Sequence, residues 1–258
     1  MRSMLLEAIA TADDALMEKY FAGEEFTPEE IIEGLKKGVV SGEICPVFAG
    51  IQQTGAAVPL MVDTLLKILP SAADAVCRFE GGEEKAFDEN GENALFVFKT
   101  IADPFVGKLS YFRVLSGKIK NDSRLINNRT GAEERLSKIM WLKGGKQEDA
   151  GEIIAGDIGS VSKLGNVLTG DTLSASGKLA AAAVEFPAPT ISVAVYPKAK
   201  GDEEKITQAF SRLCEEDPTI KVYTDNETHE QILSALGEQH IDVIISRLKS
   251  KFGAEVEL

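Results

Sequence analysis

The chain has 258 residues and a net charge of −13, from 28 basic and 41 acidic side chains. With 44% hydrophobic residues it is too apolar to be disordered, and at about 150 residues per domain its length suits two compact domains. The acidic total excludes nucleic-acid binding through bulk charge alone, although a local basic surface remains open. The three cysteines lie far apart, which fits neither a disulfide scaffold nor a zinc site and favours inert thiols in a reducing compartment.

Targeting signals are missing from the sequence. No apolar run approaches the roughly 18 residues that a membrane span needs. The first residues, Met-Arg-Ser-Met, lead directly into a helical pattern rather than into a signal peptide. We therefore expect a cytoplasmic protein with no membrane partner.

The first 45 residues predict short helices joined by polar turns. Thr27 offers an N-cap, Pro28 stands at the first helical position, and two glutamates follow in the first turn. Ile31 and Leu35 lie on the predicted buried face, and Gly38 is the predicted end of this helix.

Residues 44–49 form an apolar run of strand length, followed by a loop with glycines and by a helical pattern that Pro70 ends. This predicts a single β-α unit. Such a unit cannot cover both faces of a parallel sheet, so we expect residues 1–70 to be the last piece of a larger α/β domain.

Residues 71–92 are polar and acidic and predict a linker. Its end, residues 88–91, matches the DxxG pattern of nucleotide switch regions, but a plain turn is the far commoner reason for that pattern.

Residues 93–185 predict a small closed β-barrel. Short segments rich in β-branched and aromatic residues alternate there with turn formers. The predicted strands are 94–101, 109–115, 123–127, 135–142, 151–155 and 157–162.

A second boundary at Phe186–Pro189 opens residues 186–258, where strands and helices alternate. The predicted elements are strands at 190–196, 219–224, 231–235 and 254–258 and helices at 202–216 and 238–251. Their order, βαββαβ, is that of the split ferredoxin-like fold. The predicted fold class is therefore multidomain α+β: a short α/β remnant, a small β-barrel and a ferredoxin-like domain.

The acidity is unevenly distributed. Residues 91–185 carry 11 acids and 13 bases, whereas 1–45, 46–90 and 186–258 have net charges of −6, −4 and −5. The cations on predicted strands and turns of the barrel are Lys99, Lys108, Arg113, Lys118, Lys120, Arg124, Arg129 and Arg135. They suit contacts to phosphates, which need no base readout, and equally suit an ordinary solvated surface.

The sequence shows no catalytic constellation. Its Gly-Lys dipeptides are not followed by Ser or Thr and lack the earlier glycine of a phosphate-binding P-loop. Neither His229 nor His240 has a histidine or cysteine at ligand spacing, and we expect His240 to be structural. No nucleophile motif occurs either. We expect no catalytic residue, no metal and no nucleotide in this chain by itself.

Several segments resemble bacterial elongation factor G. The segments similar to its second domain are DPFVGKL (103–109), RVLSG (113–117), AGDIG (155–159) and TGDTL (169–173). Those similar to its third domain are PKAKGDEEK (197–205), LCEEDPT (213–219) and GEQHID (237–242). EKYFAGEE (18–25) looks like the stretch that closes the insertion of the family's G domain. The resemblance follows the family's order over nearly the whole chain.

The resemblance implies an internal piece of a ribosome-dependent GTPase that promotes translocation of tRNA and mRNA. Residues 1–70 would end the G domain and its insertion, 71–92 would link it to domain II (93–185), and domain III (186–258) would follow. GTP and Mg²⁺ would bind in the intact parent protein, not in this chain. The implied partner is the ribosome, through small-subunit rRNA and a ribosomal protein near the decoding side, and not DNA. The implied contact residues are Lys108, Arg113, Lys118 and Arg124.

Two departures from the family's pattern point to a divergent paralogue. Gly50-Ile51-Gln52 stands where the family has the Gly-Ser-Ala loop that contacts guanine. Gln239 replaces the leucine of the usual Gly-Glu-Leu-His. Two alternatives remain open: a stand-alone ribosome- or RNA-binding adaptor without GTPase activity, and part of a ribosomal-protection protein.

Overall fold

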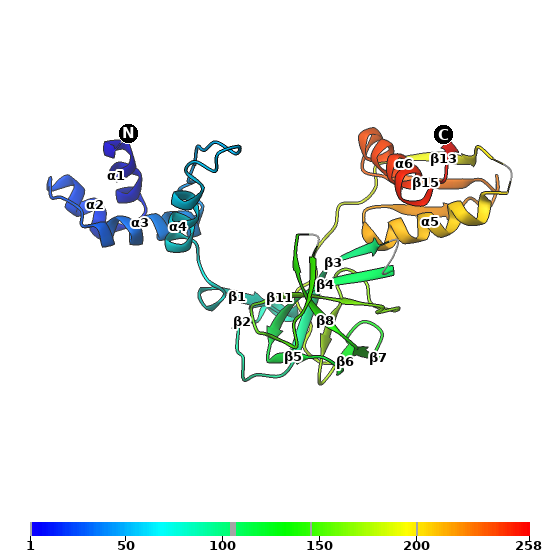
Figure 1. The fold of residues 1–258 in the computed structure, drawn as a ribbon, viewed down its shortest axis with the longest axis horizontal. Coiled ribbons are helices and arrows are strands. Elements are labelled where there is room, and N and C mark those ends of the chain that lie inside the picture. The colour runs from blue at the N-terminus through cyan, green and yellow to red at the C-terminus, as the bar shows by residue number, and fades with distance from the viewer. Residues whose placement is uncertain (1, 104–106, 145, 200) are drawn as a thin grey trace. The chain divides into compact units, whose positions relative to one another are not determined.

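The computed structural model describes residues 2–103, 107–144, 146–199 and 201–258. Pro104–Val106 of the DPFVGKL motif, Gly145 of one Gly-Lys dipeptide and Lys200 of the PKAKGDEEK motif lie outside these residues. The chain divides into two compact units, Met1–Ala75 and Val76–Leu258. Figure 1 traces both, from the blue N-terminal helices to the red C-terminal end.

The first unit is helical. Its helices are α1 (Arg2–Thr11), α2 (Asp14–Phe21), α3 (Pro28–Ser41) and α4 (Val58–Ile68). Thr27 and Glu30 form the capping box at the start of α3, as its sequence predicts. The predicted end at Gly38 is wrong, because α3 continues to Ser41 and ends on left-handed Gly42 (φ 81°). Gly38 instead makes a close approach: a Cβ there would lie 2.4 Å from Ile44 Cδ1.

The predicted strand at 44–49 is also wrong. These residues are irregular, and Val47 is 89% exposed. A strand satisfies its backbone N–H and C=O groups only through a neighbouring strand. The rest of this unit offers helices instead, so the apolar run stays unpaired.

The second unit begins inside the segment that the sequence predicts to be a linker. The 3₁₀ turn η1 (Ala72–Asp74) precedes the break, and strands β1 (Val76–Arg78) and β2 (Glu84–Ala86) pair antiparallel after it, around the turn η2 (Glu80–Gly82). Cys77 and Phe79 are buried there with Ala94 and Leu115. The mostly polar composition of residues 71–92 does not predict this small apolar cluster. Residues 88–91 do form a turn, with the Asn90 N–H donating to Asp88 Oδ1.

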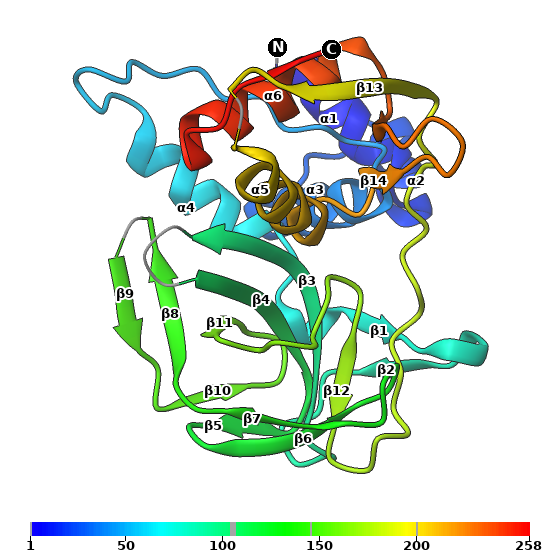
Figure 2. The same ribbon diagram turned by 90° about the vertical axis from the view of Figure 1, so that its right-hand side faces the viewer.

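The β-rich part is a curled antiparallel sheet with the strand order β7-β6-β12-β3-β4-β11-β8-β9, and its curvature is visible in Figure 2. The strands are β3 (Ala94–Asp103), β4 (Gly107–Ser116), β6 (Ser123–Asn127), β7 (Glu133–Leu136), β8 (Ile139–Lys143), β9 (Lys146–Asp149), β11 (Ile158–Ser162) and β12 (Thr172–Ser174). A separate pair joins β5 (Lys118–Lys120) to β10 (Glu152–Ile154). Within the described residues β7 and β9 are the free edges, so the predicted closed barrel is a half-barrel.

The predicted strand at 135–142 is two strands. Leu136 of β7 pairs with Ser123, whereas Ile139 of β8 pairs with Val161. The chain therefore crosses from one part of the sheet to another within two residues, which the run of apolar residues does not reveal. The core of the half-barrel includes Phe112, with no exposed surface.

Residues 186–258 form the ferredoxin-like domain that the sequence predicts, here called domain III. Its elements are β13 (Ile191–Pro197), α5 (Glu203–Glu216), β14 (Lys221–Thr224), β15 (Gln231–Ala235), α6 (Glu238–Phe252) and β16 (Val256–Glu257). The strands pair antiparallel in the order β14-β15-β13-β16, and both helices contribute to one core with the sheet. Gly253 ends α6 in the left-handed conformation (φ 61°), where glycine is favoured.

Candidate functional site

The loop at Gly50–Gln52 lies before α4 and is exposed. Ile51 forms an isolated antiparallel bridge with Ala56, and its N–H donates to the Ala56 carbonyl at 3.2 Å. A Cβ on Gly50 would lie 2.8 Å from that carbonyl oxygen, so the turn requires glycine. Ile51, 54% exposed, presents an apolar side chain of the kind that covers one face of a base.

Lys108 and Arg113 are held inside the second unit. Lys108 Nζ lies 3.3 Å from Glu215 Oε2 and 3.4 Å from the Gly165 carbonyl, and its side chain is only 13% exposed. Arg113 Nε donates to the Gly156 carbonyl at 3.1 Å, and its guanidinium lies 4.4 Å from the ring centre of Phe87. Neither cation stands free on the surface.

Lys118 and Arg124 are more accessible. Lys118 pairs with Glu89 at 3.3 Å and is 39% exposed, and Arg124 pairs with Glu133 at 2.7 Å and is 65% exposed. Exposed ion pairs of this kind contribute at most about 1 kcal/mol, so a phosphate can replace the carboxylate. The structure thus separates the four expected contact residues into two that are engaged and two that are available.

Other cations of the half-barrel divide in the same way. Lys120 and Arg135 form exposed pairs with Glu152 and Asp122. Within the part of the chain that the structure describes, the exposed half-barrel lysines without an ion pair are Lys99, Lys146, Lys163 and Lys178.

Asp171, from the TGDTL segment, organises the loop beside β12. Its carboxylate, 5% exposed, accepts hydrogen bonds from Arg129 Nε at 2.7 Å, Asn127 Nδ2 at 2.8 Å and the Leu168 N–H at 2.9 Å. Burial by itself raises the pKa of Asp171, but these donors outweigh it and hold that pKa below its ordinary value. Arg129 therefore stabilises this loop and is not a free cation on the surface.

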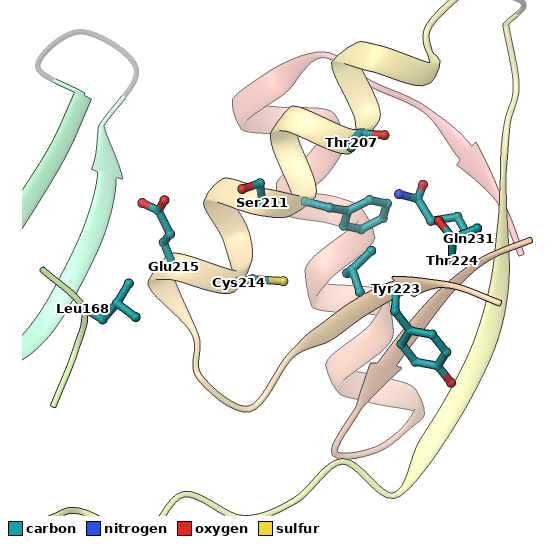
Figure 3. A pocket seen from close by; sticks show the side chains of 10 residues that line it. Leu168, Thr207, Ser211, Cys214, Glu215, Tyr223, Thr224 and Gln231 are labelled. Carbon is teal, nitrogen blue, oxygen red and sulfur yellow. The ribbon is translucent and has the colours of Figure 1, made fainter. Parts of the chain in front are cut away.

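A groove of about 480 Å³ runs along α5 and β14 (Figure 3). Phe210 and Val222 contribute apolar lining, and Tyr223, Thr224 and Gln231 line it on the strand side. Cys214 also lines it, and burial raises the pKa of this thiol, which therefore is no activated nucleophile. All three cysteines are free, and Cys45 is exposed.

The end of α5 meets the half-barrel. Glu216, whose side chain is 7% exposed, accepts a hydrogen bond from the Ala102 N–H at 2.7 Å and pairs with Lys251 at 2.8 Å. The neighbouring Glu215 pairs with Lys108 of β4. The sequence-based expectations do not include this contact between α5 and the half-barrel. Only the run of acids 215–217 points to it, because the helix dipole disfavours negative charge at a helix C-terminus.

His240 has the structural role that its position predicts. Its Nδ1 accepts from the Leu236 N–H at 3.3 Å, so its Nε2 carries the proton toward Asp217 Oδ2, 3.1 Å away. Burial raises the pKa of Asp217, but hydrogen bonds from Thr219 and the contact with His240 bring it below its ordinary value. The network ties the end of α5 to the start of α6.

Comparison with known families agrees with this architecture. Residues 92–176 match the model of elongation factor G domain 2, and residues 186–258 match that of elongation factor G, domain III. The chain is elongation factor G-like and carries domains II and III of that family. The half-barrel is thus domain II.

A solved structure from Thermus thermophilus is similar over nearly the whole chain. The two share 30% sequence identity with a TM-score of 0.75, and the match covers 99% of this chain and 37% of the other. This chain therefore spans little more than a third of the length of that relative.

Among the described residues, no helix is long and apolar enough to cross a membrane, and no three His, Cys, Asp or Glu side chains are grouped to hold a metal ion.

Proposed function

We propose that this chain belongs to a ribosome-dependent translational GTPase of the elongation factor G type, which promotes movement of tRNA and mRNA on the ribosome in the cytoplasm. The succession of domains II and III in one compact unit carries the proposal. These domains would contact the ribosome and couple it to GTP hydrolysis elsewhere in the protein.

The first unit supports a G domain as the neighbour of this chain. Helix α4 contacts α3 and buries Ile68, yet it also exposes Leu60 (68%), Leu66 (78%) and, just past its end, Leu69 (46%). Several exposed large apolar side chains on one helix are typical of a surface that a further part of the protein covers. The remaining sheet of a G domain would cover it and pair with residues 44–49.

The residues of this chain fit only one part of a site for GTP and Mg²⁺. Gly50 and Ile51 suit a contact to the guanine base, through a tight turn and an apolar side chain. A phosphate-binding loop is missing from the sequence, so triphosphate and metal would bind outside this chain. When bound, they would supply the hydrolysis that drives the factor, while this chain's residues would only orient the base.

Calorimetric titration of GTP with Mg²⁺ into the 258-residue chain tests this division. We expect no heat of binding at micromolar GTP, and clear micromolar binding would contradict it. Ribosome co-sedimentation of the same chain is expected at low salt. GTP-independent regulation of ribosomes by this chain alone would favour the adaptor alternative.

A further inference from the structure

The end of α5 carries adjacent acids that face the half-barrel. Glu215 and Glu216 stand in the last turn of the helix, where the partial negative charge of the helix end disfavours them. Each is satisfied by a group on a different strand: Glu215 by Lys108 of β4 and Glu216 by the Ala102 N–H of β3. The acids therefore serve the contact between domains rather than the helix.

Glu216 supplies the hydrogen-bond acceptor that a neighbouring strand would otherwise offer to the end of β3. β3 runs to Asp103, but its neighbour β12 pairs only with residues 94–96. The Ala102 N–H lies beyond the reach of β12, and Ala102 is only 8% exposed. A buried N–H needs an acceptor, which Glu216 Oε1 supplies at 2.7 Å. Lys251 of α6 holds the same carboxylate in position.

Beyond these acids, the contact between the two domains runs along α5 and β3. Each has its own hydrophobic core, and residues 182–190 between them have no regular structure and include Pro187 and Pro189. Besides the acids, Leu168 of domain II lines the groove beside α5. Each domain can thus stay folded if the contact opens.

We propose that Glu215 and Glu216 form an electrostatic latch that fixes domain III on the ends of β3 and β4. Glu216 is the buried part, because its side chain is 7% exposed and accepts the hydrogen bond of the buried Ala102 amide. The pair Glu215–Lys108 is the more exposed part, because the Glu215 side chain is 37% exposed. The latch is a property of the chain itself and does not depend on the proposed function.

Zero-length carbodiimide cross-linking with mass spectrometry tests the latch. The reagent activates a carboxylate, and only an amine already in contact displaces it to form an amide. We expect a Lys108–Glu215 product in the unmodified chain. The pair Lys249–Glu255, 2.9 Å apart within domain III, is the internal reference.

In Glu216→Ala, the Lys108–Glu215 product should fall at least about threefold against the reference, and the Ala102 amide should exchange hydrogen about tenfold faster. Glu216→Gln keeps an oxygen acceptor and should show smaller changes. Glu204→Ala, on an exposed position of the first turn of α5, is the matched control and should show neither change.

Two results would overturn the latch. One is an unmodified chain that yields the reference product without the Lys108–Glu215 product. The other is a Lys108–Glu215 yield that stays the same in Glu216→Ala. A persistent Lys249–Glu255 product shows that domain III has remained folded in each variant.

Discussion

Helices α5 and α4 both carry many apolar residues, yet α5 buries them on one face whereas α4 leaves several of them exposed. Ile206, Phe210 and Leu213 of α5 are each 1% exposed against the sheet of domain III, whereas Leu60 and Leu66 of α4 are mostly exposed. Their partners differ: α5 packs on the four-stranded sheet of domain III, whereas α4 packs on α3. An apolar helix face predicts burial only where its covering layer is present.

Truncation of one side chain on each helix sharpens this contrast. Phe210→Ala should lower the free energy of unfolding of domain III by about 3–5 kcal/mol, because it removes a buried aromatic ring and leaves a cavity. Leu66→Ala should change stability by less than about 0.5 kcal/mol. Urea denaturation followed by circular dichroism measures both, and similar losses for the two variants would break the comparison.

A smaller effect is expected at the carboxylate of Asp171. Asp171→Asn should cost about 2 kcal/mol at neutral pH, since it removes the charge that accepts from Arg129 and the Leu168 N–H. The folded-state pKa of Asp171 is below its ordinary value of 3.8, so its contribution is present above that value and is lost as pH falls through the folded pKa.

Unfolding of the unmodified chain and of Asp171→Asn at pH 7 and at pH 3 tests this pH dependence of stability. The stability gap between the unmodified chain and Asp171→Asn should narrow at the acidic pH. Asn128→Ala, beside the same loop but not bonded to Asp171, serves as the control. A gap that widens on acidification would contradict the assignment.

Domain III was predictable almost element by element. Ile206, Phe210 and Leu213 recur at helical spacing, and Gly253 marks the end of α6 where the structure has its left-handed cap. The core partners of these elements lie within domain III itself, so local patterns and the fold of this domain agree.

The predictions failed where the deciding partner is distant in the sequence or where the first unit holds no strand to pair with. Residues 44–49 have strand composition but no strand to pair with. Leu136 and Ile139 pair with different strands, which periodicity does not show. The contact of Ala102 with Glu216 joins residues far apart in the sequence, and only the folded structure brings them together.

The proposal that domain II of this chain contacts the ribosome is tested by the accessible cations Lys118 and Arg124. Lys118→Glu combined with Arg124→Glu should weaken ribosome co-sedimentation of the chain and reduce the slope of log affinity against log salt by about two. Lys138→Glu combined with Lys143→Glu, on exposed pairs with Asp149 and Glu148, is the charge-matched control and should change binding less. Binding and salt slope that stay the same in the double variant would contradict the claim.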